Sequence, residues 1–172
     1  MKNYEGAKKV NIDKIKAVLL YFSDNVENSY ITKILKMFYY LDFISFSERG
    51  SSVTNDIYYK LPYGPIPTFI KNEIDNLLTN ENESQLKDCF DFEKTEFGNL
   101  IRLRDRRKKA KDQCFSQYEK ELMDLIIEKI GKKTTKQVVR KTHSEKPYLL
   151  TEENGIINYN LALLLNGREI LN

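Results

Sequence analysis

Histidine and cysteine are scarce in this 172-residue chain, and tryptophan is missing. The single histidine, His143, excludes a catalytic pair of histidines and a metal site built from several of them. Cys89 and Cys114 lack the Cys-x-x-Cys spacing, which argues against a disulfide framework and leaves one disulfide between them open. The motifs GxSxG, GxxxxGKS/T, GxGxxG and HExxH are also missing. We therefore expect no catalysis, no cofactor and no metal site, although carboxylates that converge only on folding would leave no motif.

Long apolar runs are missing as well. No stretch approaches the ~18 apolar residues of a membrane helix, and residues 1–10 are polar and lysine-bearing rather than an apolar leader. We expect a reduced, cytoplasmic protein with no membrane partner. The 28 Lys and Arg residues nearly balance 25 Asp and Glu, and a net charge of +3 argues against a dedicated nucleic-acid binder.

Enough apolar residues are present for a core, with a hydrophobic fraction of 41% that includes 11 tyrosines and 9 phenylalanines. Their spacing predicts a central helix over about residues 29–48, apolar on nearly all sides and followed by a C-cap glycine at Gly50. Alternating residues over 90–103 predict a β-hairpin. Further helices are predicted over about 12–26, 67–78, 116–130 and 134–143.

Local signals place the ends of these elements. Asn11, Ser116 with Glu119, and Thr134 or Thr135 are predicted N-caps. Residues 53–61 favour a strand, residues 62–67 read as a dense turn leading into a helix, and Pro147 is expected to stop the last helix.

The predicted fold class is α+β and predominantly helical: a compact bundle of about five to six helices around the central helix, with a few short strands. The length suits a single domain over residues 1–172, with a core of about 12–150 and a tail of 151–172 docked on it.

Two basic features leave alternatives open. The first is a run of cations. It is either a patch that binds phosphates or an acidic partner, or simply a solvated loop. We favour the solvated loop because no aromatic platform accompanies the cations. The members of the run are Arg102, Arg104, Arg106, Arg107, Lys108 and Lys109. The second is a helix-turn-helix pattern over about residues 121–142, which predicts a DNA-binding regulator as the alternative function. An ordinary helical hairpin is favoured there because Val138 and Val139 are needed for packing.

Aromatic residues and the lone histidine are the other candidates. Tyr58, Tyr59 and Tyr63 surround a proline-rich turn, where they either contact a protein partner or cover a small core. His143 either binds a partner as a proton donor or acceptor or, as we favour, bonds backbone carbonyls and closes the end of its helix.

Three segments, taken in order, resemble the Panacea (SocA-like) antitoxin family. Residues 33–39 (KILKMFY) are similar to its early core helix of K-L-x-K-L-x-Y character. Residues 58–67 (YYKLPYGPIP) are similar to its aromatic strand followed by Y-G-P-V/I-P. Residues 133–148 end in THSEKPY, similar to its terminal H-x-x-x-P-aromatic motif. The resemblance covers about residues 12–150 without 79–112, and Tyr148 stands where the family usually has tryptophan.

This resemblance implies a mostly helical domain with a few short strands and without catalysis. Members are antitoxins of bacterial or phage-associated origin that neutralise unrelated toxins by direct binding, and one branch is an adaptor that delivers its toxin to a protease. The implied partner is a cognate toxin protein, joined by a protease in the adaptor case. The motif positions are Lys33, Tyr63, Gly64, Pro65, Pro67, His143 and Pro147. Together with Tyr58 and Tyr59, they are the candidate residues for contact with a partner protein.

Overall fold

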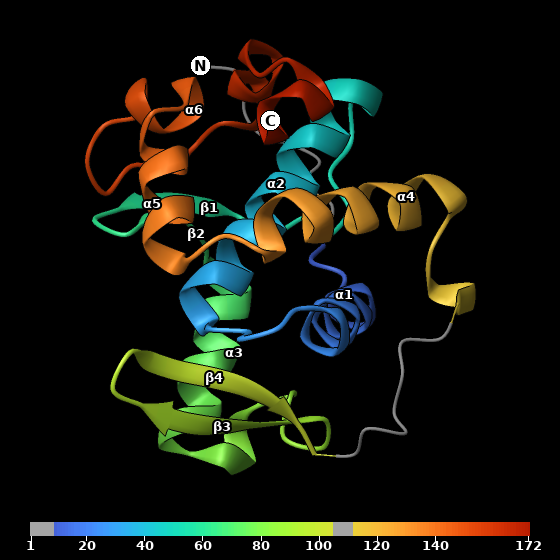
Figure 1. The fold of residues 1–172 in the computed structure, drawn as a ribbon, viewed down its shortest axis with the longest axis vertical. Helices are drawn as coiled ribbons and strands as arrows, with labels where there is room; N and C mark the ends of the chain where they lie inside the picture. Colours follow the sequence, from blue (N-terminus) through green and yellow to red (C-terminus); the bar gives the residue numbers. More distant parts are fainter. Residues whose placement is uncertain (1–8, 105–111) are drawn as a thin grey trace.

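A computed structural model describes residues 9–104 and 112–172. Helix α2 (Ile31–Arg49) runs through the middle of the molecule (Figure 1), and every residue from Lys33 to Ser45 is buried. The predicted central helix is therefore confirmed. Gly50 ends it in the left-handed conformation with φ of 71°, as a C-cap glycine does.

Other helices surround α2 and confirm a predominantly helical α+β fold. Helix α4 was expected to reach residue 130, but its α-helical part ends at Ile126 and a π-helical turn, Ile127–Gly131, follows. The helices around α2 are α1 (Ile12–Asn25), α3 (Thr68–Thr79), α4 (Gln117–Ile126), α5 (Thr135–His143) and α6 (Lys146–Leu149). Short 3-10 segments occupy Glu81–Glu83, Asp112–Cys114, Tyr159–Leu164 and Gly167–Leu171.

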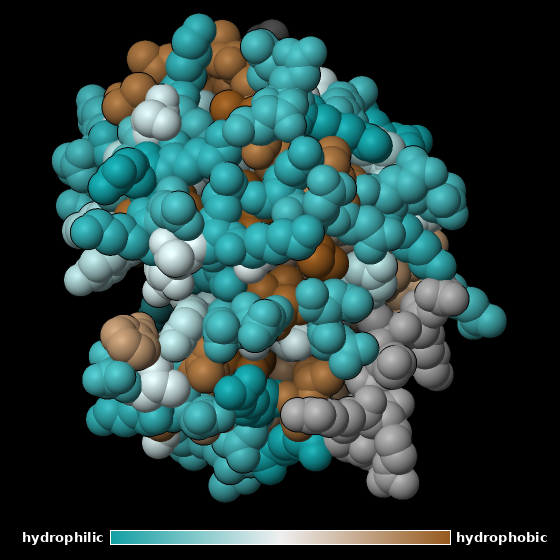
Figure 2. Space-filling model, in the orientation of Figure 1, coloured by the Kyte–Doolittle hydropathy of each residue, from teal (hydrophilic) through white to brown (hydrophobic). Residues whose placement is uncertain are grey.

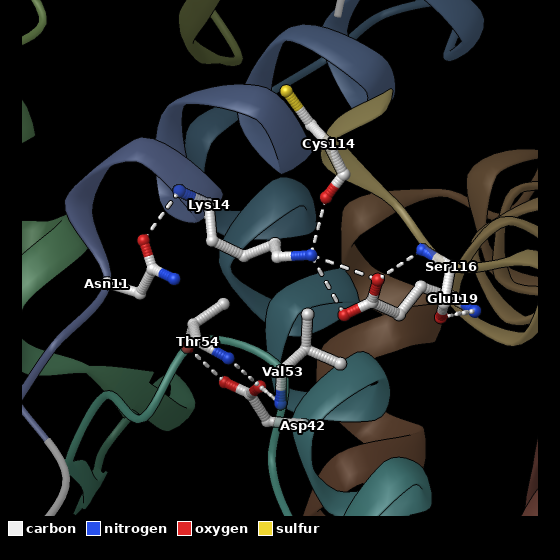
Figure 3. A network of polar contacts seen from close by, with 8 residues as sticks. All are labelled: Asn11, Lys14, Asp42, Val53, Thr54, Cys114, Ser116 and Glu119. Atoms are coloured by element: carbon white, nitrogen blue, oxygen red, sulfur yellow. Dashed lines mark hydrogen bonds and ion pairs between the residues drawn. The ribbon is translucent and has the colours of Figure 1, made fainter. Parts of the chain in front are cut away.

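The predicted caps start the helices. Asn11 accepts from the Lys14 backbone N–H at 3.0 Å, and Ser116 with Glu119 forms a complete capping box on α4. The Lys14 ammonium also bonds Glu119 at 2.9 Å, so one lysine links the starts of α1 and α4 (Figure 3). Thr134 caps α5 in a second capping box with Gln137.

Two antiparallel hairpins complete the fold. The predicted hairpin over 90–103 is confirmed as β3 (Phe90–Thr95) and β4 (Gly98–Leu103). The other hairpin corrects two expectations, because the strand expected over 53–61 covers only β1 (Tyr58–Leu61), and β2 (Gly64–Pro67) replaces most of the predicted turn. Prolines fit there because, among the described residues, β2 pairs only with β1, so their missing N–H groups face no second described strand.

Pro147 also differs in part from expectation. Helix α5 ends at His143, before Pro147, as expected, but Pro147 itself lies in the first turn of a further helix, α6, where proline lacks no needed hydrogen bond. The cysteines, Cys89 and Cys114, are free thiols, so the disulfide left open by the sequence is not formed.

The tail packs against the core as a run of short contacts. The Ile157 N–H donates to the Tyr58 carbonyl at 2.8 Å, which places the tail along β1. Tyr159 then stacks on Phe43 of α2 with ring centroids 4.8 Å apart, and Leu165 and Leu171 are buried. Within the described residues, none of the helices has the length and apolar character needed to cross a bilayer.

Candidate functional site

The sequence motifs meet around the buried amine of Lys36. This residue lies on α2 and is 0% exposed, and its Nζ donates to the Pro65 carbonyl of β2 at 2.9 Å. Burial lowers the pKa of Lys36 to about 7. The amine thus ties the Tyr63-Gly64-Pro65 turn to the central helix.

Gly64 allows this close packing. Its φ of 99° is one that side chains rarely adopt. A Cβ at this position would lie 2.8 Å from Lys36 Cε and 2.9 Å from Thr142 Oγ1. The β1–β2 turn, α2 and α5 therefore meet at a point that accepts glycine alone.

His143 lies beside this point and stacks flat on Tyr148, with ring centroids 4.4 Å apart and planes 6° apart. Burial and then the positive charge of Lys36 lower the pKa of His143, which favours the neutral ring. Its Nε2 is shielded and has no hydrogen-bond partner within the described residues. The expected bonds from this nitrogen to backbone carbonyls are thus not formed, and the ring closes the helix end by stacking.

Two further polar groups belong to this region, one against the Tyr148 ring and one between His143 and Tyr148 in the sequence. The Lys60 ammonium lies 4.7 Å from the centre of the Tyr148 ring and donates to the Thr151 carbonyl at 3.0 Å. Glu145 accepts from the Tyr40 hydroxyl at 2.7 Å, and burial raises its pKa to about 7. We call Lys36, Gly64, Thr142, His143, Glu145 and Tyr148 the motif cluster.

The sequence did not single out Lys36, Thr142 or Glu145. One local signal was available for Lys36, because it is a lysine inside a helix that is apolar on nearly all sides. Nothing local marks Thr142 or Glu145, whose surroundings depend on how α5 and α6 pack.

Lys33 lies apart from the motif cluster. Its Nζ donates to the carbonyls of Glu27 at 3.1 Å and Gly131 at 2.9 Å, so it links α2 to the end of the π-helical turn. It neither contacts His143 nor lies free on the surface, since it is 4% exposed.

The three tyrosines divide between core and surface. Tyr58 is buried and its hydroxyl donates to Asp42 at 2.7 Å, as the core interpretation expected. Tyr59 is half-buried, whereas Tyr63 is 71% exposed at the hairpin turn. Tyr63 is the member of this group that suits contact with a partner.

The basic run is only partly described. Arg102 pairs with Glu93 at 2.8 Å and Arg104 pairs with Glu81, so a carboxylate matches each of these two cations. Arg106, Arg107, Lys108 and Lys109 lie outside the described residues. No group of three or more His, Cys, Asp or Glu side chains in the described ranges could hold a metal ion.

The family model described as "Antitoxin SocA-like, Panacea domain" matches residues 34–148, more than half of the chain. The chain belongs to this family. No curated protein and no solved structure matches the chain. The Panacea range contains the whole motif cluster and also residues 79–112, so β3 and β4 lie inside it although the three sequence segments did not cover them.

An exposed apolar surface adjoins the motif cluster of this Panacea domain. Two leucines of α6 and its end, Leu149 and Leu150, are 59% and 61% exposed. Leu163 and Leu164 of the neighbouring 3-10 segment are 63% and 43% exposed. Figure 2 shows apolar side chains gathered at the top of the molecule, where α6 and the tail lie. We call these four residues the leucine patch.

Proposed function

We propose that this protein is an antitoxin that neutralises a cognate toxin by binding it directly, without catalysis. Membership of the antitoxin-like Panacea family is the observation that carries the proposal. The protein would act in the cytoplasm of a bacterium or of a phage-infected cell, and residues 1–172 would work as one domain.

The leucine patch is the proposed contact with the toxin. Four exposed leucines on adjacent segments resemble the apolar centres of protein interfaces, where a few side chains supply most of the affinity. Tyr63 is a second candidate contact. Binding here would inhibit the toxin by sterically blocking the surface through which the toxin acts.

The motif cluster has a supporting role in this proposal. Lys36, Gly64 and Thr142 hold the β1–β2 turn against α2 and α5, and the His143–Tyr148 stack fixes the start of α6. The prolines at 65, 67 and 147 restrict the backbone of the same segments. These residues would therefore present the leucine patch in one conformation.

Co-expression tests the proposal. Each neighbouring gene product is induced with and without the tagged chain, followed by growth measurement and purification of the tagged protein. We expect one product to be toxic alone, tolerated with the chain, and recovered in equimolar amount. If no toxic neighbour is neutralised or captured, the antitoxin proposal fails.

Substitutions then test the surface. The L149E/L163E variant should lose the complex, whereas I57E should retain it because Ile57 is 48% exposed but lies outside the patch. Thermal unfolding of each variant shows whether the fold persists. The rate of toxin degradation is then measured in cells with and without each cytoplasmic protease. In the adaptor mechanism the toxin is degraded faster when the chain and the protease are both present, whereas simple capture leaves this rate unchanged.

A further inference from the structure

A second surface lies at the other end of α2, between the start of α5 and the β3–β4 hairpin. A hollow of about 740 Å³ opens there. Figure 2 shows the surface indented on the left of the view, between the upper part of the molecule and the hairpin below. The residues of this hollow that matter for charge and stacking are Glu27, Tyr30, Lys33, Phe97, Lys132, Lys133 and Lys136.

Positive charge dominates this hollow. Lys132, Lys133 and Lys136 line it against one carboxylate, that of Glu27, among its described lining residues. A fourth lysine there, Lys33, is 4% exposed and donates to backbone carbonyls. Within the described part of the chain, Lys132, Lys133 and Lys136 form no ion pair. For a chain whose net charge is only +3, this is a concentrated and unmatched group of cations.

A section of mixed character, with exposed apolar side chains, continues from the lysines. A smaller hollow of about 240 Å³ shares Tyr30, Phe97 and Thr135 with the first one. Leu78, 44% exposed, lies on its wall, and Phe97 stands 77% exposed at the turn between β3 and β4. The two hollows together form a groove, here called the lysine groove. One half holds the unpaired lysines, and the other holds the exposed side chains of Phe97 and Leu78 beside the Lys71–Asp75 ion pair.

We propose that the lysine groove binds an acidic polypeptide segment of the toxin. Carboxylates of that segment would pair with Lys132, Lys133 and Lys136, and an adjacent apolar side chain would pack against Phe97 and Leu78. This inference rests on the proposed function for the identity of the partner, and it adds the chemistry of the bound segment. The toxin would thus contact the protein at two sites, one apolar and one charged.

The shape of the groove favours a polypeptide over duplex DNA. A recognition helix reads bases with its N-terminal residues inside the major groove. Here the N-terminal residue of α5, Thr135, lines the same hollow as Phe97, so the hairpin stands opposite the residues that would have to enter DNA. An extended acidic chain is narrow enough to lie between them.

Fluorescence anisotropy with the full chain tests this inference without the toxin. The probe is a fluorescein-labelled peptide of glutamates around one leucine, and its control replaces each glutamate by glutamine. We expect the glutamate peptide alone to bind, and K132E/K136E to weaken it about tenfold or more through loss and reversal of the ion pairs. F97A should weaken it too, because the apolar contact is lost.

The matched control is K9E/K146E, which changes the net charge equally at two exposed lysines outside the groove. It should bind the glutamate peptide within about twofold of the parent protein. Equal weakening by both double variants would overturn the inference, because the effect would then come from overall charge. Displacement of the peptide by random duplex DNA at lower concentration than by unlabelled peptide would overturn it in favour of nucleic acid. Neither result depends on whether a toxin is captured.

Discussion

Asp42 shows, at the scale of a single residue, how this core holds a buried carboxylate. Its side chain is 0% exposed and accepts from the backbone N–H groups of Val53 and Thr54, each at 2.8 Å (Figure 3). The hydroxyls of Thr54 and Tyr58 donate to its other oxygen. Burial raises its pKa to about 6 even though all four bonds favour the charged form.

Replacing Asp42 by alanine should therefore be costly. Two backbone N–H groups and two hydroxyls would lose their acceptor inside the core, and we expect the free energy of unfolding to fall by about 3 kcal/mol or more. Urea unfolding measures this. The exposed Asp13→Ala change should cost less than about 1 kcal/mol, and equal effects of the two changes would contradict the interpretation.

Lys36 makes stability depend on pH. The unfolded chain keeps the lysine proton up to its ordinary pKa of 10.5, whereas the folded protein releases it near 7. Between these values the unfolded state binds more protons, so this group makes the free energy of unfolding rise with pH. Below about pH 7 both states are protonated, and the full cost of burying the charge is present.

The Lys36→Met variant should lack that rise. Its stability relative to the parent protein should be highest near pH 6 and should decline steadily toward about pH 9, as measured by urea unfolding at several pH values. His143 faces Lys36, but burial and the Lys36 charge lower its pKa from 6.5, so the ring is mostly neutral above that pH. Parallel stability curves for the two proteins would show that Lys36 keeps its proton when buried.

At the scale of elements, α3 begins in an unusual way. Pro67 occupies its N-cap position and offers no side-chain acceptor. Asp56, which precedes β1, takes that role from outside by accepting from the N–H groups of Phe69 at 2.9 Å and Ile70 at 3.1 Å. A buried carboxylate thus satisfies the first turn of α3 and holds the helix against the β1–β2 hairpin.

Asp56→Ala should lower the free energy of unfolding by about 2 kcal/mol, because a cap is lost in a buried position. Ser116→Ala removes an exposed cap from α4 and should cost about 1 kcal/mol. Chemical unfolding of both variants measures the difference. A smaller effect at Asp56 than at Ser116 would contradict its role as the cap of α3.

Elements with local signals were predictable, and those that depend on distant partners were not. Helices α1, α2 and α5 follow from signals within their own segments: Asn11 caps the start of α1, Thr134 caps the start of α5, and Gly50 ends the apolar helix α2. Strand β2 was missed because its prolines indicate a turn, and only pairing with β1 makes a strand there. The motif cluster was half predicted: Gly64 and His143 belong to recognisable motifs, whereas Lys36 and Glu145 are defined by side chains brought from elsewhere.

At the scale of the whole molecule, the two proposed surfaces lie at opposite ends of α2 and should affect binding differently. The leucine patch adjoins α6, while the lysine groove adjoins the β3–β4 hairpin (Figure 1). Apolar contacts at the centre of an interface mainly set how slowly a complex dissociates, and charges at its rim mainly set how fast it forms.

With the captured toxin, L163E should therefore raise the dissociation rate and leave the salt dependence of association nearly unchanged. K132E/K136E should slow association and flatten its dependence on ionic strength. Surface plasmon resonance over a series of salt concentrations separates these effects. Association that stays equally sensitive to salt in K132E/K136E would remove the lysine groove from the toxin interface.

The position of the tail has a consequence for any fragment of this protein. The family match ends at residue 148, yet the N–H groups of Lys60 and Ile157 join β1 to the tail through bonds to Gly155 and Tyr58. A fragment that ends at the family boundary would leave β1 with an open, hydrogen-bonding edge and would uncover Phe43 beneath Tyr159. Open strand edges recruit other chains. We therefore expect the tail to limit self-association, and a domain shortened to residue 148 should precipitate where the 172-residue chain stays dispersed.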